Sequence, residues 1–377
     1  MNTQVIEQIV DIVEKEAYTD IFIRPDEETR IKTPKGWLPV SEIAKGSRPT
    51  PISRSMLTEL IGALSGNERW DADMADKRES LAFMLPMDEK GTRLRFKIAE
   101  CAPRASGQRG KVANDFTVNI RKLPSKIPTI ASLSLPRTVT DMLKSSGGLV
   151  LVTGPTGSGK TTTLASMVDH INRNRYANIV TLEKLVEYVI APEKSIITQR
   201  TVPHPVPSFL KGIEDALDGQ AVDVMMIGEV VDIPAMEAML RAAESGHLVL
   251  ATMHARNAVG AISRIADMFN ADDMRVRLSM LADKLIGVVA QKLLPNKKGD
   301  GYVLAHEILR NDTPGVASAI RENKIHSLQN VLLQGANAGM ATLNQHLASL
   351  IRANSIDMEV ALDATYDPTE LRQIIGH

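Results

Sequence analysis

The stretch "LVLVTGPTGSGKTTTL" runs from Leu149 to Leu164 and joins an apolar run to a glycine-rich loop that ends in Lys160 and Thr161. The loop fits the pattern G-x-x-x-x-G-K-[ST], in which glycines allow backbone N–H groups to turn toward phosphate oxygens. In such a loop the lysine reaches the β and γ phosphates, and the hydroxyl that follows it can bind Mg²⁺. A strand-like segment precedes the loop and a helix-like segment follows it, as this mechanism requires. The sequence therefore predicts a nucleotide-binding site for ATP with Mg²⁺.

The residues predicted to contact the nucleotide are Gly154, Pro155, Thr156, Gly157, Ser158, Gly159, Lys160, Thr161 and Thr162. A phosphate-binding loop of this kind needs a carboxylate nearby to bind the metal ion or orient water. Two apolar strands supply candidates: Glu229 follows "DVMMIG", and Glu183 ends "NIVTLE". Two carboxylates at neighbouring strand ends can divide the support of Mg²⁺ and the orientation of the attacking water. We predict Thr161 and Glu229 as the metal-binding pair. Taken alone, either carboxylate is also compatible with a solvated loop.

Two histidines flank a third apolar strand, "HLVLATMH". His254 ends this strand, where it can sense the γ-phosphate, whereas His247 begins it and is expected to be structural.

The composition is that of an ordinary globular protein. The chain has 377 residues, 44% of them hydrophobic and 24% charged, so two domains are expected. Lys and Arg number 44 against 45 Asp and Glu, and this balance gives no general basis for binding nucleic acid or an anionic membrane. No run reaches the roughly 18 apolar residues of a membrane span. The single cysteine, Cys101, is typical of a reducing compartment, so we expect a cytoplasmic protein and no catalytic thiol.

The residues up to 123 predict a smaller α+β domain. Apolar residues recur at helical spacing from Val5 to Val13, and strand-like segments follow, separated by turn-rich ones such as "MDEKG" and "ASGQRG". These strands are "YTDIFIRP", "TRIKTPKGWLPV", "SLAFMLPM", "TRLRFKIAE" and "DFTVNIRKLP".

A proline-rich linker is expected over 124–138, because Pro124, Pro128 and Pro136 exclude a continuous helix there. From 139 to 377, apolar strands alternate with helical patterns, which indicates an α/β domain with a mostly parallel sheet between helix layers.

Taken in order, these motifs resemble the secretion ATPase superfamily, the hexameric motors of type II and type IV secretion, conjugation and type IV pili. "GPTGSGKTTT" is similar to its Walker A motif, "TLEKLVEY" to its acidic box, "IGEVVD" to its Walker B motif and "AAESGHLVLATMHARNA" to its histidine box. "TQRTV", "AHEIL" and "YDPTELRQII" resemble the PilT-like branch, which includes pilus retraction and conjugative or type IVB secretion ATPases. The two functions remain alternatives of nearly equal weight.

The resemblance implies a RecA-like ATPase domain, preceded by a PAS-like domain, within a homo-hexamer that acts on an inner-membrane platform or on secretion-channel proteins. It also implies that arginines of one subunit's N-terminal domain approach the nucleotide of its neighbour. Arg95 is the main candidate, with Arg93 and Arg121 in matching stretches, and Arg200 matches a further family arginine. Ordinary surface ion pairs are the alternative for these side chains. The protein would then lie at the inner membrane only through its partners.

Several positions depart from the motifs of this family. Lys184 and Leu185 stand where the acidic box has Asp-Pro, Glu214 and Asp218 stand in place of two arginines, and Val231 replaces the Walker B arginine. We therefore expect a slow ATPase, and a nucleotide-binding regulatory subunit is the alternative. A motor that translocates DNA is disfavoured by the near-zero charge and by only 3% aromatic residues, and no direct contact with nucleic acid is expected.

Overall fold

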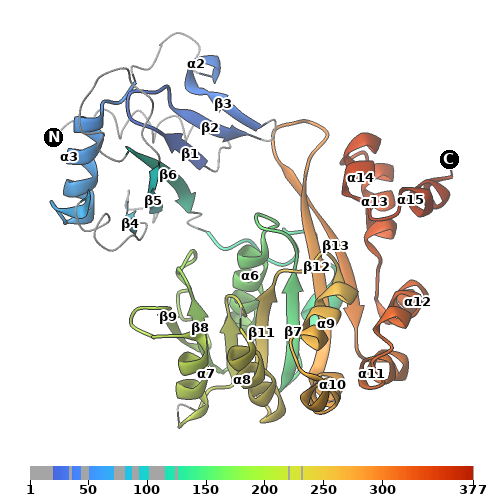
Figure 1. The fold of residues 1–377 in the computed structure, drawn as a ribbon. Helices are drawn as coiled ribbons and strands as arrows, with labels where there is room; N and C mark the ends of the chain where they lie inside the picture. Colours follow the sequence, from blue (N-terminus) through green and yellow to red (C-terminus); the bar gives the residue numbers. More distant parts are fainter. Residues whose placement is uncertain are drawn as a thin grey trace. The chain divides into compact units, whose positions relative to one another are not determined.

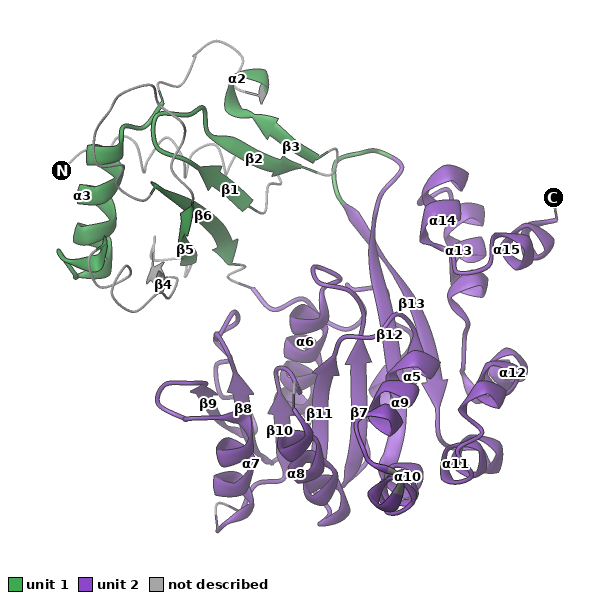
Figure 2. Ribbon diagram, viewed as in Figure 1, with its two compact units in different colours: residues 1–125, 298–301 green, residues 126–297, 302–377 purple. Residues whose placement is uncertain are grey.

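The computed structural model describes residues 20–33, 36–43, 51–71, 81–86, 93–101, 115–123, 126–219, 221–230 and 232–376. The chain divides into two compact units, which are coloured separately in Figure 2. Unit 1 comprises residues 1–125 with 298–301, and unit 2 comprises 126–297 with 302–377. The helix expected from Val5 to Val13, the turn segments at 87–91 and 105–110, and Val231 lie outside the described residues.

Unit 1 contains one antiparallel sheet whose strands lie in the order β3-β2-β1-β6-β5-β4. Alternate residues of its central strands are buried, so the sheet presents one apolar face to a small core. Helix α3 packs on that core through Leu57 and Ile61. The helix starts at the Ser53 cap and ends at Gly66, whose φ of 67° is easily adopted only by glycine. Its elements are β1 (Asp20–Ile23), β2 (Arg30–Thr33), β3 (Gly36–Pro39), α2 (Val40–Ile43), α3 (Arg54–Ser65), β4 (Leu81–Pro86), β5 (Arg93–Cys101) and β6 (Asp115–Leu123).

Unit 2 is built on a larger sheet with the strand order β13-β12-β7-β11-β10-β8-β9. All neighbouring strands are parallel except β12 and β13, which form an antiparallel edge. The strands are β7 (Gly148–Thr153), β8 (Asn178–Glu183), β9 (Ile196–Thr201), β10 (Val224–Ile227), β11 (Leu248–Met253), β12 (Leu285–Pro295) and β13 (Tyr302–Arg310).

Both faces of this sheet are covered by helices (Figure 1). In β7, Leu149 and Leu151 belong to one core and Val150 and Val152 to the other, so the strand is buried on both sides. Helix α6 contributes to the second core, and α7 to α11 contribute to the first. The helices are α5 (Arg137–Met142), α6 (Lys160–Asn174), α7 (Phe209–Leu217), α8 (Ile233–Glu244), α9 (Ala258–Asp267), α10 (Ala271–Lys284), α11 (Pro314–Arg321), α12 (Leu328–Gln334), α13 (Leu343–Arg352), α14 (Met358–Ala364) and α15 (Pro368–Ile375), with short 3₁₀ turns at Ile325–Ser327 and Gly335–Ala338.

The predicted fold class is confirmed: a mostly parallel α/β unit follows a smaller unit with an antiparallel sheet. The segment before α5 packs on unit 2, because Ile130 and Leu135 are buried there and the Ser166 hydroxyl donates to the Pro128 carbonyl at 2.6 Å. Nowhere along the described residues is a helix both long and apolar enough to cross a membrane.

A buried carboxylate joins two helices, α9 and α13, to the sheet. Glu307 of β13 accepts backbone N–H groups from Ala258 at 2.8 Å and from Leu343 at 3.4 Å, which are the first residues of α9 and α13. A negative side chain is favourable at a helix N-terminus, so one residue stabilises two helix starts. Burial nevertheless raises the pKa of this carboxyl group above its usual value.

Candidate nucleotide site

The glycine-rich loop connects β7 to α6 and has the backbone that its sequence requires. Gly154, Gly157 and Gly159 have φ angles of 154°, 79° and 85°, a region that other residues rarely adopt. Gly154 is also closely packed, because a Cβ atom there would lie 2.3 Å from the Gln291 carbonyl oxygen and 2.6 Å from Ser158 Oγ. The loop conformation therefore depends on glycine at this position.

A residue that the sequence analysis missed supports the loop from the neighbouring strand. Gln291 of β12 is 2% exposed, and its Nε2 donates to the Ser158 carbonyl at 2.6 Å. Within the described part of the chain, Ser158 Oγ and Gln291 Oε1 are buried and make no hydrogen bond. These are unused polar atoms beside a loop expected to bind phosphate. The only signal in the sequence is one amide, followed by Lys292, within the mostly apolar run "LIGVVAQKLL".

Lys160 begins α6 and is folded back over the loop. Its Nζ donates to the carbonyl oxygens of Gly154 and Pro155, both at 2.9 Å, and lies 3.5 Å from Nδ1 of His254. Burial lowers the pKa of this ammonium group, and the charge of Glu229 opposes that shift. Thr161 is half-buried in the same helical turn, and the Thr162 hydroxyl lies 3.0 Å from that of Tyr188.

The ends of β8, β10 and β11 meet beside the loop. The three strands are in parallel register, and the Gly228 N–H donates to the Leu182 carbonyl at 2.7 Å. The Thr252 hydroxyl donates to the Gly228 carbonyl and so joins the turn after β10 to β11. A side chain at Gly228 would come within 3.1 Å of the Leu182 carbonyl oxygen, so glycine allows this close approach. The register thus brings Glu229 and His254 to one edge of the sheet.

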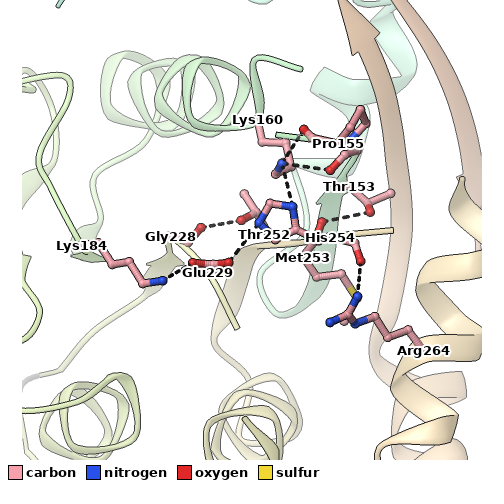
Figure 3. A network of polar contacts seen from close by, with 11 residues as sticks. Thr153, Pro155, Lys160, Lys184, Gly228, Glu229, Thr252, Met253, His254 and Arg264 are labelled. Carbon is pink, nitrogen blue, oxygen red and sulfur yellow. Dashed lines mark hydrogen bonds and ion pairs between the residues drawn. The ribbon is translucent and has the colours of Figure 1, made fainter. Parts of the chain in front are cut away.

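Four charged or titratable side chains form a chain of contacts at this edge, shown in Figure 3. Next to Lys160 is His254, whose Nε2 lies 3.0 Å from Oε1 of Glu229. The other carboxylate oxygen, Oε2, accepts from Lys184 Nζ at 2.5 Å. Burial opposes ionisation of Glu229, but the hydrogen bond and charge of Lys184, with His254, outweigh it and lower the pKa of the carboxyl group. Glu229 therefore lies between the Lys184 ammonium group and the His254 ring.

Glu183 faces a different set of partners. It is 4% exposed, and its Oε1 accepts from the Thr181 hydroxyl at 2.7 Å and from Gln199 Nε2 at 3.2 Å. The sequence predicts that the two strand-end acids divide the support of the metal and the orientation of water, and in the structure they have distinct surroundings. His247 lies at the other end of β11, where its Nδ1 is 3.0 Å from the Ala242 carbonyl oxygen at the end of α8.

The arginines singled out in the sequence fall into two groups. Arg93 and Arg95 lie on β5, and Arg121 lies directly opposite Arg95 on β6, so all three share one face of the sheet in unit 1. Arg121 also forms a two-pronged ion pair with Asp20, at 2.8 and 3.1 Å. Arg200 lies on β9 of unit 2 and pairs with Asp215 at 3.3 Å.

The two acidic residues noted as departures, Glu214 and Asp218, are exposed on α7 and at its C-terminal end. Cys101 is half-buried at the end of β5.

Comparison with known proteins places this geometry in a family. Residues 86–374 match the model of the type II/IV secretion system protein family. A twitching motility protein of Neisseria gonorrhoeae is 41% identical over 241 residues, which cover 64% of each chain. The type IV pilus ATPase PilU of Pseudomonas aeruginosa is 32% identical over 369 residues, covering 98% of this chain and 91% of PilU.

Solved structures agree with this assignment. A crystal structure of the pilus retraction motor PilT with bound ADP has a TM-score of 0.79 and 32% identity, covering 97% of this chain and 98% of that one. The structure of the ATPase DotB of Legionella pneumophila has a TM-score of 0.80 and 20% identity, covering 95% of this chain and 94% of DotB. At this level of identity the similarity shows a shared fold only. The chain therefore belongs to the type II/IV secretion system protein family and, within it, to the PilT-like secretion ATPases.

Proposed function

We propose that this protein is an ATP-hydrolysing motor of a type IV pilus or of a related type IV secretion machine. The observation that carries the proposal is the chain of contacts at the sheet edge, in which a phosphate-loop lysine, a histidine and a carboxylate lie in sequence. A phosphoryl-transfer site needs a cation for the phosphates and a carboxylate for the attacking water or the metal, and this edge provides both. The bound ADP of the similar PilT structure supports the choice of nucleotide.

The residues at this edge fit a magnesium ion. Hydroxyl and carboxylate oxygens are the ligands that Mg²⁺ prefers, and the Glu229 carboxylate already attracts the cationic Lys184 beside it. Thr161 and Glu229 would hold the ion, which would supply charge neutralisation at the phosphate oxygens.

The remaining roles follow from the contacts of each side chain. Lys160 binds the β and γ phosphates after leaving the carbonyls of Gly154 and Pro155, and the loop from Gly154 to Thr162 supplies backbone N–H groups to the phosphates. Glu229 accepts a proton from the attacking water or orients it, and His254 contacts the γ-phosphate. Glu183 assists from the end of β8, where Thr181 and Gln199 fix its orientation.

Assembly into a homo-hexamer completes the proposed site. In this arrangement Arg95, with Arg93 and Arg121 on the same sheet face, faces the nucleotide of a neighbouring subunit. Arginines supplied in this way stabilise the charge of the transition state. Hydrolysis moves the N-terminal domain, residues 1–123, relative to the ATPase domain, residues 139–377, about the linker at 124–138. A cytoplasmic ring passes this motion to inner-membrane platform or secretion-channel proteins.

A second candidate is a weakly active, regulatory subunit of the same machinery. The ion pair between Lys184 and Glu229 favours slow turnover, because it engages the carboxylate that hydrolysis requires.

Of the two kinds of machine, the similarity to PilU and PilT supports a motor of a type IV pilus over a motor of a secretion system.

The test is ATP hydrolysis by the full-length protein beside Glu229→Gln, with the assembly state measured by light scattering in the same buffer. We expect slow, magnesium-dependent hydrolysis by a hexamer, and a fall of about a hundredfold or more in Glu229→Gln with nucleotide binding retained. Glu244→Gln, an exposed site at the end of α8, makes the same charge change and should hydrolyse ATP at the wild-type rate. Tight nucleotide binding with no turnover in the assembled wild type would favour the regulatory subunit instead.

A further inference from the structure

Both oxygens of the Glu229 carboxylate are engaged in the structure. Lys184 Nζ lies 2.5 Å from Oε2, and His254 Nε2 lies 3.0 Å from Oε1. The Glu229 side chain is 22% exposed, so it is partly shielded from solvent. A carboxylate has about four acceptor positions, so these two contacts leave room for a water molecule. The Lys184 ammonium group nevertheless neutralises the charge of Glu229 and would compete with a metal ion for Oε2.

Lys184 is the partner with more freedom to leave. Its side chain is 60% exposed and follows the last residue of β8, so it reaches Glu229 from the surface. A lysine held in one conformation loses considerable side-chain entropy, which favours its release. His254 is held on more sides, since its carbonyl accepts from Arg264 Nη1 at 2.9 Å and its ring lies against Lys160.

The other charged groups at this edge are committed elsewhere. Lys160 is directed to the carbonyls of Gly154 and Pro155, and the Oε1 atom of Glu183 accepts from Thr181 and Gln199. Lys184 is thus the cation that directly neutralises Glu229 from the β8 side. It also stands at a position where the acidic box departs from the motif it resembles.

We propose that Lys184 is a removable restraint on Glu229, which occupies and neutralises the carboxylate and must swing away before each hydrolysis event. This inference rests on the proposed ATPase function. Lys184 is a positioning residue, because it acts only through Glu229. The restraint limits the chemical step and leaves the phosphate-binding loop untouched, so at saturating Mg²⁺ its removal changes kcat and not the KM for ATP.

The test compares the full-length protein with Lys184→Met and Lys184→Arg. An ion pair with one exposed partner contributes little, so we expect kcat of Lys184→Met to rise by about two- to fivefold with KM for ATP unchanged. Lys184→Arg keeps the cation and should remain at the wild-type kcat. Lys144→Met is the matched control. Lys144 is also an exposed lysine, at 68%, and its Nζ pairs with Asp141 at a distance of 2.6 Å, outside this site. This substitution should leave kcat unchanged.

A binding measurement provides a readout that is independent of turnover. The Mg²⁺ concentration needed for half-maximal binding of a fluorescent ADP analogue should fall by about two- to fivefold in Lys184→Met, because the carboxylate is released. An unchanged or lower kcat, or an unchanged magnesium requirement, would overturn the inference while leaving the ATPase proposal intact. Absence of hydrolysis in the wild type and in Lys184→Met alike would instead refute both. Hydrolysis only in Lys184→Met would support the restraint in its strongest form.

Discussion

A buried histidine pair in unit 2 makes the stability of that unit dependent on pH. His306 of β13 is 5% exposed, and its ring stacks on that of His346 with 3.6 Å between centroids. The His306 backbone N–H donates to Nδ1 of His346 at 3.0 Å, so this nitrogen carries no proton. Burial lowers the pKa of His306 from 6.5 to about 3 and that of His346 to about 4. Both rings are therefore neutral in the folded protein at neutral pH.

The sign of the effect follows from proton binding in the two states. In the unfolded chain both rings titrate near 6.5, so below that pH the unfolded state binds more protons than the folded one. The stabilisation is complete above pH 6.5 and declines as the pH falls toward the folded-state values of about 4 and about 3. In that window, the contribution of each histidine to the free energy of unfolding falls by about 1.4 kcal/mol for each unit by which the pH falls. At pH 5 the loss is about 2 kcal/mol for each ring, or about 4 kcal/mol for the pair.

The measurement is urea unfolding of the full-length protein at several pH values between 7.5 and 5, followed by far-ultraviolet circular dichroism. The chain has two tryptophans, Trp37 and Trp70, and both belong to unit 1, so tryptophan emission reports that unit separately. His306→Phe keeps an aromatic ring and removes one titrating group. Its free energy of unfolding should depend on pH less steeply than the wild type, by about 1.4 kcal/mol per unit between pH 6 and 5. Equal pH dependence in the two proteins would refute the argument.

Two further predictions concern the phosphate loop. Gly154→Ala should abolish binding of a fluorescent ADP analogue, because a Cβ atom would lie 2.3 Å from the Gln291 carbonyl oxygen; wild-type affinity would contradict this. Gly315→Ala is its control, since a Cβ atom there meets only Val331, at 3.7 Å. Gln291→Leu removes the hydrogen bond to the Ser158 carbonyl and should weaken binding of the same analogue about 5- to 30-fold, equivalent to about 1–2 kcal/mol. A dissociation constant equal to that of the wild type would show that the loop keeps its shape without this support.

Much of unit 2 could be predicted from the sequence because its signals are local. The motif and the helical pattern after it predict the segment 160–174, and α6 spans Lys160–Asn174. The run "NIVTLE" predicts a strand, and β8 comprises those six residues, Asn178–Glu183. Strands buried on both faces leave few alternatives to a parallel sheet between helices. The edge strand β9 was missed because "IITQRT" alternates little between apolar and polar residues, and its pairing with β8 decides its conformation.

The contacts that shape the site could not be predicted, because they join distant parts of the chain. Gln291 reaches Ser158 across 133 positions, and Lys184 reaches Glu229 across 45. No sequence motif predicts either contact, because each depends on which strands become neighbours and on their register. The sequence identified Lys184 as a departure from a family motif, but the loss of an acidic residue gave no indication of which carboxylate the new cation would contact.

The geometry also explains why the four side chains of the site cannot be treated as independent. Lys160, His254, Glu229 and Lys184 are linked by successive contacts of 3.5, 3.0 and 2.5 Å, and each comes from the end of a different strand or from the loop after it. One lysine therefore contacts the carboxylate directly, and the other contacts the histidine beside it. When a phosphate draws Lys160 away from His254, the histidine loses a neighbour on one side while Glu229 keeps Lys184 on the other. Residues in one network of this kind show coupling energies in double-mutant cycles, whereas distant residues do not. The effect of Lys184→Met should therefore depend on whether His254 is present, and that of Lys144→Met should not.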